Sequence, residues 1–193
     1  MAIILERIRI QNFKPFDNYL VEFNSSNLVV FDGPNGFGKT SFYDAIELLF
    51  TGNLRRYSDL VGKIIDKRQS SLGSPLLNDR GEGDLIIKVQ LDVNGEKIYL
   101  LRLGIRDDLL LDENTKIPEL KLYQIDQFDS EEFILVEDED SYLTDLLGKN
   151  YAENFEFLNY IEQEENIHLL KNKGKGRKDA IAHLFNTESE QPT

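Results

Sequence analysis

A glycine-rich stretch restricts the possible folds of this chain more than any other feature of the sequence. Residues Gly33 to Thr40 follow the pattern G-x-x-x-x-G-K-T, directly after the apolar run Leu28 to Phe31. A strand, a glycine turn and an amphipathic helix in this order predict a phosphate-binding loop. The helix is expected to end near Gly52, because one face carries apolar residues up to that point, namely Phe42, Ala45, Ile46, Leu49 and Phe50. Leu28 to Phe31 is expected to be an internal strand, since all four residues are apolar.

Each residue type in the loop has a chemical reason. Glycines let the backbone turn so that its N–H groups converge on phosphate oxygens, and the helix N-terminus adds partial positive charge. Lys39 is expected to reach the β- and γ-phosphates, and the Thr40 hydroxyl to coordinate Mg²⁺. We therefore expect ATP and Mg²⁺ as ligands. The residues expected to bind the nucleotide are Gly33, Pro34, Asn35, Gly36, Phe37, Gly38, Lys39, Thr40 and Ser41.

The other hydrophobic patterns predict an α/β domain with several strands. Residues 3–12 alternate isoleucines with polar residues, as in a strand with one buried face. Asn94-Gly95 separates two apolar runs, which predicts a β-hairpin. Residues 53–83 carry several glycines, so loops and one short helix are expected there. Further strands are expected at 19–23, 120–125 and 133–136, and helices at 141–147 and 177–185.

Composition narrows the class of protein. A chain of 193 residues with 40% hydrophobic content can build a domain with a core. It has no cysteine, which favours the cytosol, and no apolar run reaches the roughly 18 residues of a membrane span. The net charge of -13 argues against a nucleic-acid footprint over the whole surface. Two local stretches are basic, although solvated faces are the plainer interpretation of both: Arg55, Arg56, Lys63, Lys67 and Arg68, and Lys171, Lys173, Lys175, Arg177 and Lys178.

Three motifs together carry a more specific resemblance. Asn12-Phe13-Lys14 closes the first strand, Gly33 to Ser41 holds the loop, and Asp44-Ala45-Ile46 follows in the helix. This combination resembles the N-terminal half of an ABC-type ATPase head, in the group that includes SMC, SbcC and RecF-like DNA-maintenance ATPases. The resemblance implies an α/β P-loop NTPase lobe with a mixed sheet, a hairpin-rich subregion and the P-loop helix.

A downstream segment extends the resemblance. Tyr160 to Glu165, followed by Arg177 and by Ala182 to Phe185, resembles the family's Q-loop and the start of its coiled-coil arm. By that resemblance Gln163 approaches Mg²⁺ and the attacking water, a task that suits a neutral amide. An ordinary surface glutamine is the alternative. The resemblance further implies one head lobe over residues 1–193, with a strand, P-loop and helix core at 1–52, a hairpin-containing lobe at 53–157, and the Q-loop and arm at 158–193.

Lys14 matches a basic position that can reach the nucleotide in this family. A plain surface lysine is the alternative interpretation. Pro15 departs from the family pattern and leaves the direction of the Lys14 side chain open.

Motifs that complete such a head are missing from the sequence. No Leu-Ser-Gly-Gly-type signature is found. Phe133 to Asp138 mimics a Walker B strand, but its two acids are in reversed order, the acidic run continues, and the segment precedes Gln163. His168 and His183 are interpreted as surface or packing residues. The chain is therefore expected to bind nucleotide weakly and to hydrolyse it negligibly by itself.

The resemblance implies ATP-dependent dimerisation of heads in DNA repair, recombination or chromosome maintenance. The expected partners are the C-terminal half of the same head, a second head, DNA, and a nuclease or effector subunit; no membrane is expected. A nucleotide-sensing ATPase subunit of an antiviral defence complex is the alternative, because such systems use the same head. A self-contained P-loop kinase or GTPase is disfavoured, since no Asn-Lys-x-Asp segment is present.

Overall fold

The computed structural model describes residues 3–23, 26, 28–54, 57, 74–110 and 118–154. The chain divides into two compact units, residues 1–147 and 148–193. In the second unit the described part contains one short helix, α5 (Tyr151–Asn154). The division at 1–52, 53–157 and 158–193 expected from the sequence stays a prediction.

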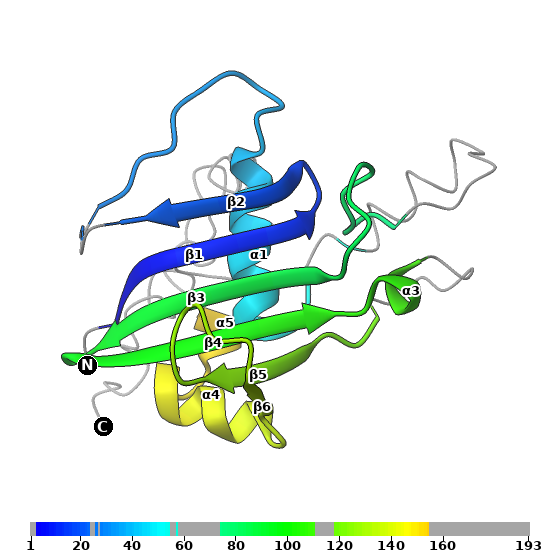
Figure 1. The fold of residues 1–193 in the computed structure, drawn as a ribbon. Helices are drawn as coiled ribbons and strands as arrows, with labels where there is room; N and C mark the ends of the chain where they lie inside the picture. Colours follow the sequence, from blue (N-terminus) through cyan, green and yellow to red (C-terminus); the bar gives the residue numbers. More distant parts are fainter. Residues whose placement is uncertain are drawn as a thin grey trace, which may run out of the picture. The chain divides into compact units, whose positions relative to one another are not determined.

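A six-stranded sheet forms the first unit, with α1 (Lys39–Thr51) against one of its faces (Figure 1). The strand order is β2-β1-β3-β4-β5-β6, and every ladder between neighbours is antiparallel. Two more helices, α3 (Arg106–Leu109) and α4 (Glu139–Leu147), belong to this unit. The strands are β1 (Ile3–Phe13), β2 (Phe16–Glu22), β3 (Leu85–Val93), β4 (Glu96–Gly104), β5 (Lys121–Ile125) and β6 (Phe133–Leu135).

Alternation along the strands creates the core. Ile8 and Ile10 on β1 are fully buried, while Arg7 and Arg9 between and beside them face the other way. On α1 the buried apolar residues recur at helical spacing and turn one face toward the sheet. The apolar core residues of α1 and the adjoining strand β3 are Phe42, Ala45, Leu48, Leu49, Leu85, Ile87, Val89 and Leu91.

The predicted hairpin is confirmed. Val93 pairs with Glu96, so the connection has only two residues. Asn94 and Gly95 have φ values of 53° and 93°, the left-handed values that a type I′ turn requires at both central positions. The twist of this turn matches the twist of the strands, which explains why β3 and β4 pair along their full length.

The internal strand expected at Leu28 to Phe31 is wrong. These residues pair with no described strand, and Leu28 and Val30 are 80% and 77% exposed. Phe31 packs on α1, with its ring centre 4.5 Å from that of Phe42. An internal strand needs a hydrogen-bonded neighbour on each side, and the apolar run by itself supplies neither. Without a strand at Leu28 to Phe31, the described sheet contains antiparallel pairs throughout. It therefore differs from the mixed sheet that we expected.

The remaining expectations for secondary structure have mixed outcomes. The strands predicted at 3–12, 19–23, 120–125 and 133–136 and the helix predicted at 141–147 are confirmed, with boundaries that move by up to three residues. The P-loop helix ends as predicted at Gly52, whose N–H donates to the Leu48 carbonyl in a left-handed cap. The helix expected at 177–185 and most of 53–73 lie outside the described residues. Within the described parts of the chain, no helix is long and apolar enough to cross a membrane.

A buried arginine on β4 connects the sheet to two helices. The Arg102 side chain is 1% exposed, and its Nη2 donates to the Leu49 carbonyl in the last turn of α1 at 2.8 Å. Its Nη1 donates to the Leu120 carbonyl at 2.8 Å and pairs with Glu139 of α4 at 2.6 Å. The other Glu139 oxygen accepts from the Leu122 N–H. A cation at a helix C-terminus also complements the helix dipole.

Replacing Arg102 by Met is expected to lower the free energy of unfolding by about 3–5 kcal/mol, because it leaves the Glu139 carboxylate and two buried carbonyls without their donor. Urea unfolding followed by circular dichroism measures the change. Lys121→Met, at an exposed position on β5, is the control and should stay within about 0.5 kcal/mol of the parent. Equal stability of the two variants would show that Arg102 does not hold the fold together.

Candidate phosphate-binding site

The predicted loop has the backbone that phosphate binding requires. Gly33, Gly36 and Gly38 have φ values of 150°, 90° and 87°, in the region that favours glycine. Gly38 is the N-cap of α1, and its carbonyl accepts the Phe42 N–H at 2.9 Å. The first N–H groups of a helix have no partner within the helix. The loop therefore offers donors and a positive helix end at one place, as an anion site needs.

Lys39 lies within the loop. Its Nζ donates to the Gly33 carbonyl at 2.5 Å and to the Pro34 carbonyl at 2.9 Å. Both acceptors are neutral, and phosphate oxygens are stronger acceptors for an ammonium group. These two contacts hold the ammonium against the first two residues of the loop.

Most of the other loop residues expected to bind nucleotide are exposed to solvent. Thr40 is exposed on the first turn of α1, and Ser41 beside it is half-buried. Phe37 is 75% exposed between two glycines. Pro34 and Asn35 are also exposed. No group of three or more acidic or histidine side chains within the described residues could hold a metal by itself. The oxygen donor that the start of α1 offers a cation is the exposed Thr40 hydroxyl.

The β1–β2 turn touches the loop. A Cβ atom added to Gly38 would lie 3.0 Å from Pro15 Cγ and 3.0 Å from Phe16 Cζ. Gly38 is thus required twice, by its φ and by this close approach. In the sequence, Pro15 left the direction of the Lys14 side chain open. In the structure, the Pro15 ring packs against the loop at Gly38.

Lys14 faces the P-loop helix. Its Nζ lies 2.5 Å from the Asp44 carboxylate on α1, and the two side chains are 10% and 2% exposed. A role for Asp44 was missed by sequence reasoning, which used it only as part of a motif. Its position among Phe42, Ala45 and Leu48 on the apolar helix face could have revealed it, because a buried acid requires a partner.

Two asparagines fix the backbone on either side of Lys14. Asn12 has a φ of 53° and donates from Nδ2 to the Asp84 carbonyl at 2.8 Å. Asn78 donates from Nδ2 to the Lys14 carbonyl at 2.6 Å, while its N–H donates to the Asn12 carbonyl. The first residue of the Asn12-Phe13-Lys14 motif therefore has a structural role, because Asn12 stabilises the backbone next to this turn.

The segment that mimics Walker B has another role. Strand β6 lies at the edge of the sheet, and Ile134 is 76% exposed. The Asp138 side chain accepts the Ser141 N–H and so caps α4, while Glu139 pairs with Arg102. A Walker B strand is internal, so these contacts agree with our interpretation that 133–138 is not one.

Three cations on the face of the sheet away from α1, Arg7, Arg9 and Lys88, already have partners. Arg7 and Arg9 lie within 3.8 Å and 3.3 Å of the Asp129 carboxylate, and the Arg7 guanidinium stacks on Phe128 with its carbon 4.2 Å from the ring centre. Burial lowers the pKa of Lys88, and the charge of Arg9 lowers it further. This face is therefore not an open basic surface.

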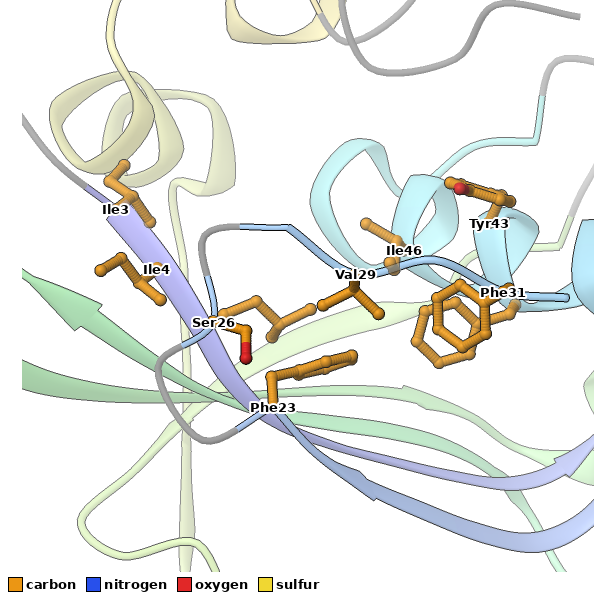
Figure 2. Close-up of a pocket in the computed structure, with 10 residues that line it drawn as sticks. Ile3, Ile4, Phe23, Ser26, Val29, Phe31, Tyr43 and Ile46 are labelled. Atoms are coloured by element: carbon orange, nitrogen blue, oxygen red, sulfur yellow. The ribbon is translucent and has the colours of Figure 1, made fainter.

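An apolar pocket of about 350 Å³ lies between β1, residues 23–31 and α1 (Figure 2). Its lining consists of aliphatic and aromatic side chains with the hydroxyls of Ser26 and Tyr43. None of the described residues that line it is charged, so these side chains do not offer a triphosphate a binding partner.

Several predicted functional residues lie outside the described residues. They are Gln163 and the segments around it at 160–165 and 182–185, His168, His183, and the two basic stretches at 55–68 and 171–178. Their roles stay predictions.

Comparison with known protein families matches residues 7–191 to a family described as an AAA domain. The match covers nearly the whole chain and includes the phosphate loop, α1 and all the strands from β3 to β6.

Gly38→Ala is expected to destabilise the chain more than Gly36→Ala does. Both glycines have φ values near 90°, so alanine costs about 1–2 kcal/mol at either position. At Gly38 the new methyl group also meets Pro15 and Phe16, whereas at Gly36 it meets nothing within 4 Å. Overpacking should add about 1 kcal/mol, measurable by urea unfolding. Equal losses would mean that the β1–β2 turn does not press on the loop.

Proposed function

This chain belongs to the AAA domain family of P-loop ATPases, and from that membership we propose that it is the ATP-binding N-terminal part of an SMC- or SbcC-like ATPase head. The observation that carries the proposal is the loop itself, with three glycines at positive φ and the Lys39 ammonium held against its first two residues. The motifs at 12–14 and 44–46 add support, because they surround this loop in the same order as in those ATPases.

The proposed nucleotide complex combines the loop and the first turn of α1 with Lys14 and Gln163. Backbone N–H groups of the loop and of the first turn of α1 donate to phosphate oxygens, and Lys39 exchanges its two carbonyl partners for the β- and γ-phosphates. The Thr40 hydroxyl holds Mg²⁺, which neutralises phosphate charge. Gln163 orients water near the metal, and Lys14 contributes positive charge from the β1–β2 turn. These roles rest on the resemblance and on the chemistry of the donors.

We further propose that a C-terminal part of the head covers residues 28–31. Leu28 and Val30 are large, apolar and exposed, and such side chains gain stability when another apolar surface removes them from water. That part supplies the Walker B acids and the signature, and two heads then enclose two ATP molecules. ATP binding thus couples head closure to access to DNA, with a nuclease or effector subunit as a further partner.

ATP is expected to bind to this chain without appreciable turnover, and Lys39→Ala is expected to weaken binding by at least about tenfold, because the phosphates lose a charge-assisted donor. Titration calorimetry with Mg²⁺ and a phosphate-release assay on the same samples measure both quantities. Lys121→Ala, an exposed lysine on β5, controls for the loss of charge. Rapid turnover abolished by Lys39→Ala would show that the chain has its own catalytic acid and would refute the incomplete-head proposal.

DNA binding is expected to involve the basic stretch at 55–68. Reversing the charge of Arg55, Arg56, Lys63, Lys67 and Arg68 in the full-length protein should weaken DNA affinity and reduce its dependence on salt, because fewer counterions are released. Fluorescence anisotropy at several salt concentrations measures both. Reversal of Lys121 and Lys149 is the control. Unchanged affinity in the five-residue variant would exclude this stretch as the DNA contact.

A further inference from the structure

We propose that Asp44 is a positioning residue for the nucleotide site: it holds the Lys14 ammonium beside the phosphate loop. This inference rests on the proposed ATP site and extends it to a residue with no assigned role. It draws on the burial of the pair, on the backbone of Lys14 and on the contact between the turn and the loop.

Lys14 and Asp44 are so deeply buried that each charge needs the other to offset its loss of hydration. Asp44 is 2% exposed and Lys14 is 10% exposed, with 2.5 Å between the ammonium and the carboxylate. Removing either charge alone would leave the other buried without this partner. The attraction within such a pair is largely offset by the loss of hydration, so fold stability gives little reason for it. A role in placing the cation does give a reason.

The backbone of Lys14 points to the same conclusion. The turn between Phe13 and Phe16 has two central residues, and the first of them, Lys14, has a φ of 49°. A positive φ followed by a proline, whose ring fixes φ near -65°, is the pattern of a type II′ turn. Glycine is favoured at that first position, and other residues there are strained. The backbone of this turn therefore does not explain a lysine at position 14, and we look for the reason in its side chain.

The turn is also fixed against the loop. The Lys14 N–H donates to the Leu76 carbonyl at 2.8 Å, and the Lys14 carbonyl accepts from Asn78 at 2.6 Å. The next two residues, Pro15 and Phe16, make the close approach to Gly38. The Lys14 backbone is held by residues 76 and 78, and its ammonium is paired with Asp44 on α1, so the side chain reaches from the β1–β2 turn to the P-loop helix. Preorganised charge of this kind favours a polyphosphate without reorganisation on binding.

A double-mutant cycle on the 193-residue chain tests the inference. The four proteins are the parent, Asp44→Asn, Lys14→Met and the double variant; methionine keeps the length and backbone strain of lysine without its charge. Calorimetry with ATP and Mg²⁺ gives affinities, and thermal unfolding of each protein identifies losses that reflect folding. Asp44→Asn should weaken ATP binding about tenfold when Lys14 is present and less than about twofold in the Lys14→Met background.

Two outcomes of the cycle would overturn the inference. Equal losses in both backgrounds would show that Asp44 acts on α1 without Lys14. Unchanged or tighter binding in Asp44→Asn would show that Asp44 competes with the nucleotide for the lysine. If Asp44→Asn does not fold, Lys14→Arg, which keeps the ion pair, should retain affinity within about threefold while Lys14→Met loses about tenfold; equal affinities would refute the proposal. Lys39→Ala distinguishes failure of this inference from failure of the proposed ATP site. If ATP binding survives Lys39→Ala, the ATP site itself is rejected.

Discussion

The Arg102 guanidinium joins parts of the fold that are distant in sequence. It binds the Leu49 carbonyl at the end of α1, the Leu120 carbonyl before β5 and the Glu139 carboxylate at the start of α4. A charge with almost no solvent exposure is stable only when every donor finds an acceptor, so these contacts must form together. Arg102 thereby fixes the C-terminal end of α1 on the sheet, and the helix carries the phosphate loop at its other end. The direction of the helix that carries the loop depends on that anchor.

The N-terminal end of α1 is held by different means. Gly38 packs against Pro15 and Phe16, and Asp44 pairs with Lys14, so the β1–β2 turn supports both the loop and the first turns of the helix. The two ends together give a helix that is clamped to one sheet at Asp44 and at Leu49, positions about one and a half turns apart. A helix fixed in this way presents its N–H groups and positive dipole in a constant direction, which is the physical requirement for binding an anion tightly.

Sequence reasoning was most successful where structure depends on residues close together in the chain. The turn at Asn94-Gly95, the positive φ values of the loop glycines and the cap at Gly52 follow from the conformational freedom of glycine and asparagine, and all are present. The expectation of an internal strand at Leu28 to Phe31 was wrong because strand pairing requires neighbours that no local pattern can supply. Asp44 was recognised as part of a motif, but its partner lies 30 residues away.

The sequence by itself therefore determined the phosphate loop, the helix that follows it and the hairpin, because each is a property of a few consecutive residues. Only the tertiary structure decided that Lys14 faces Asp44, that Pro15 supports Gly38 and that Arg102 closes the end of α1. Those contacts join residues 23 to 53 positions apart. Hydrophobic periodicity records which side of an element is buried, but it does not record which buried group lies opposite, and that choice is made by the packing of the whole sheet.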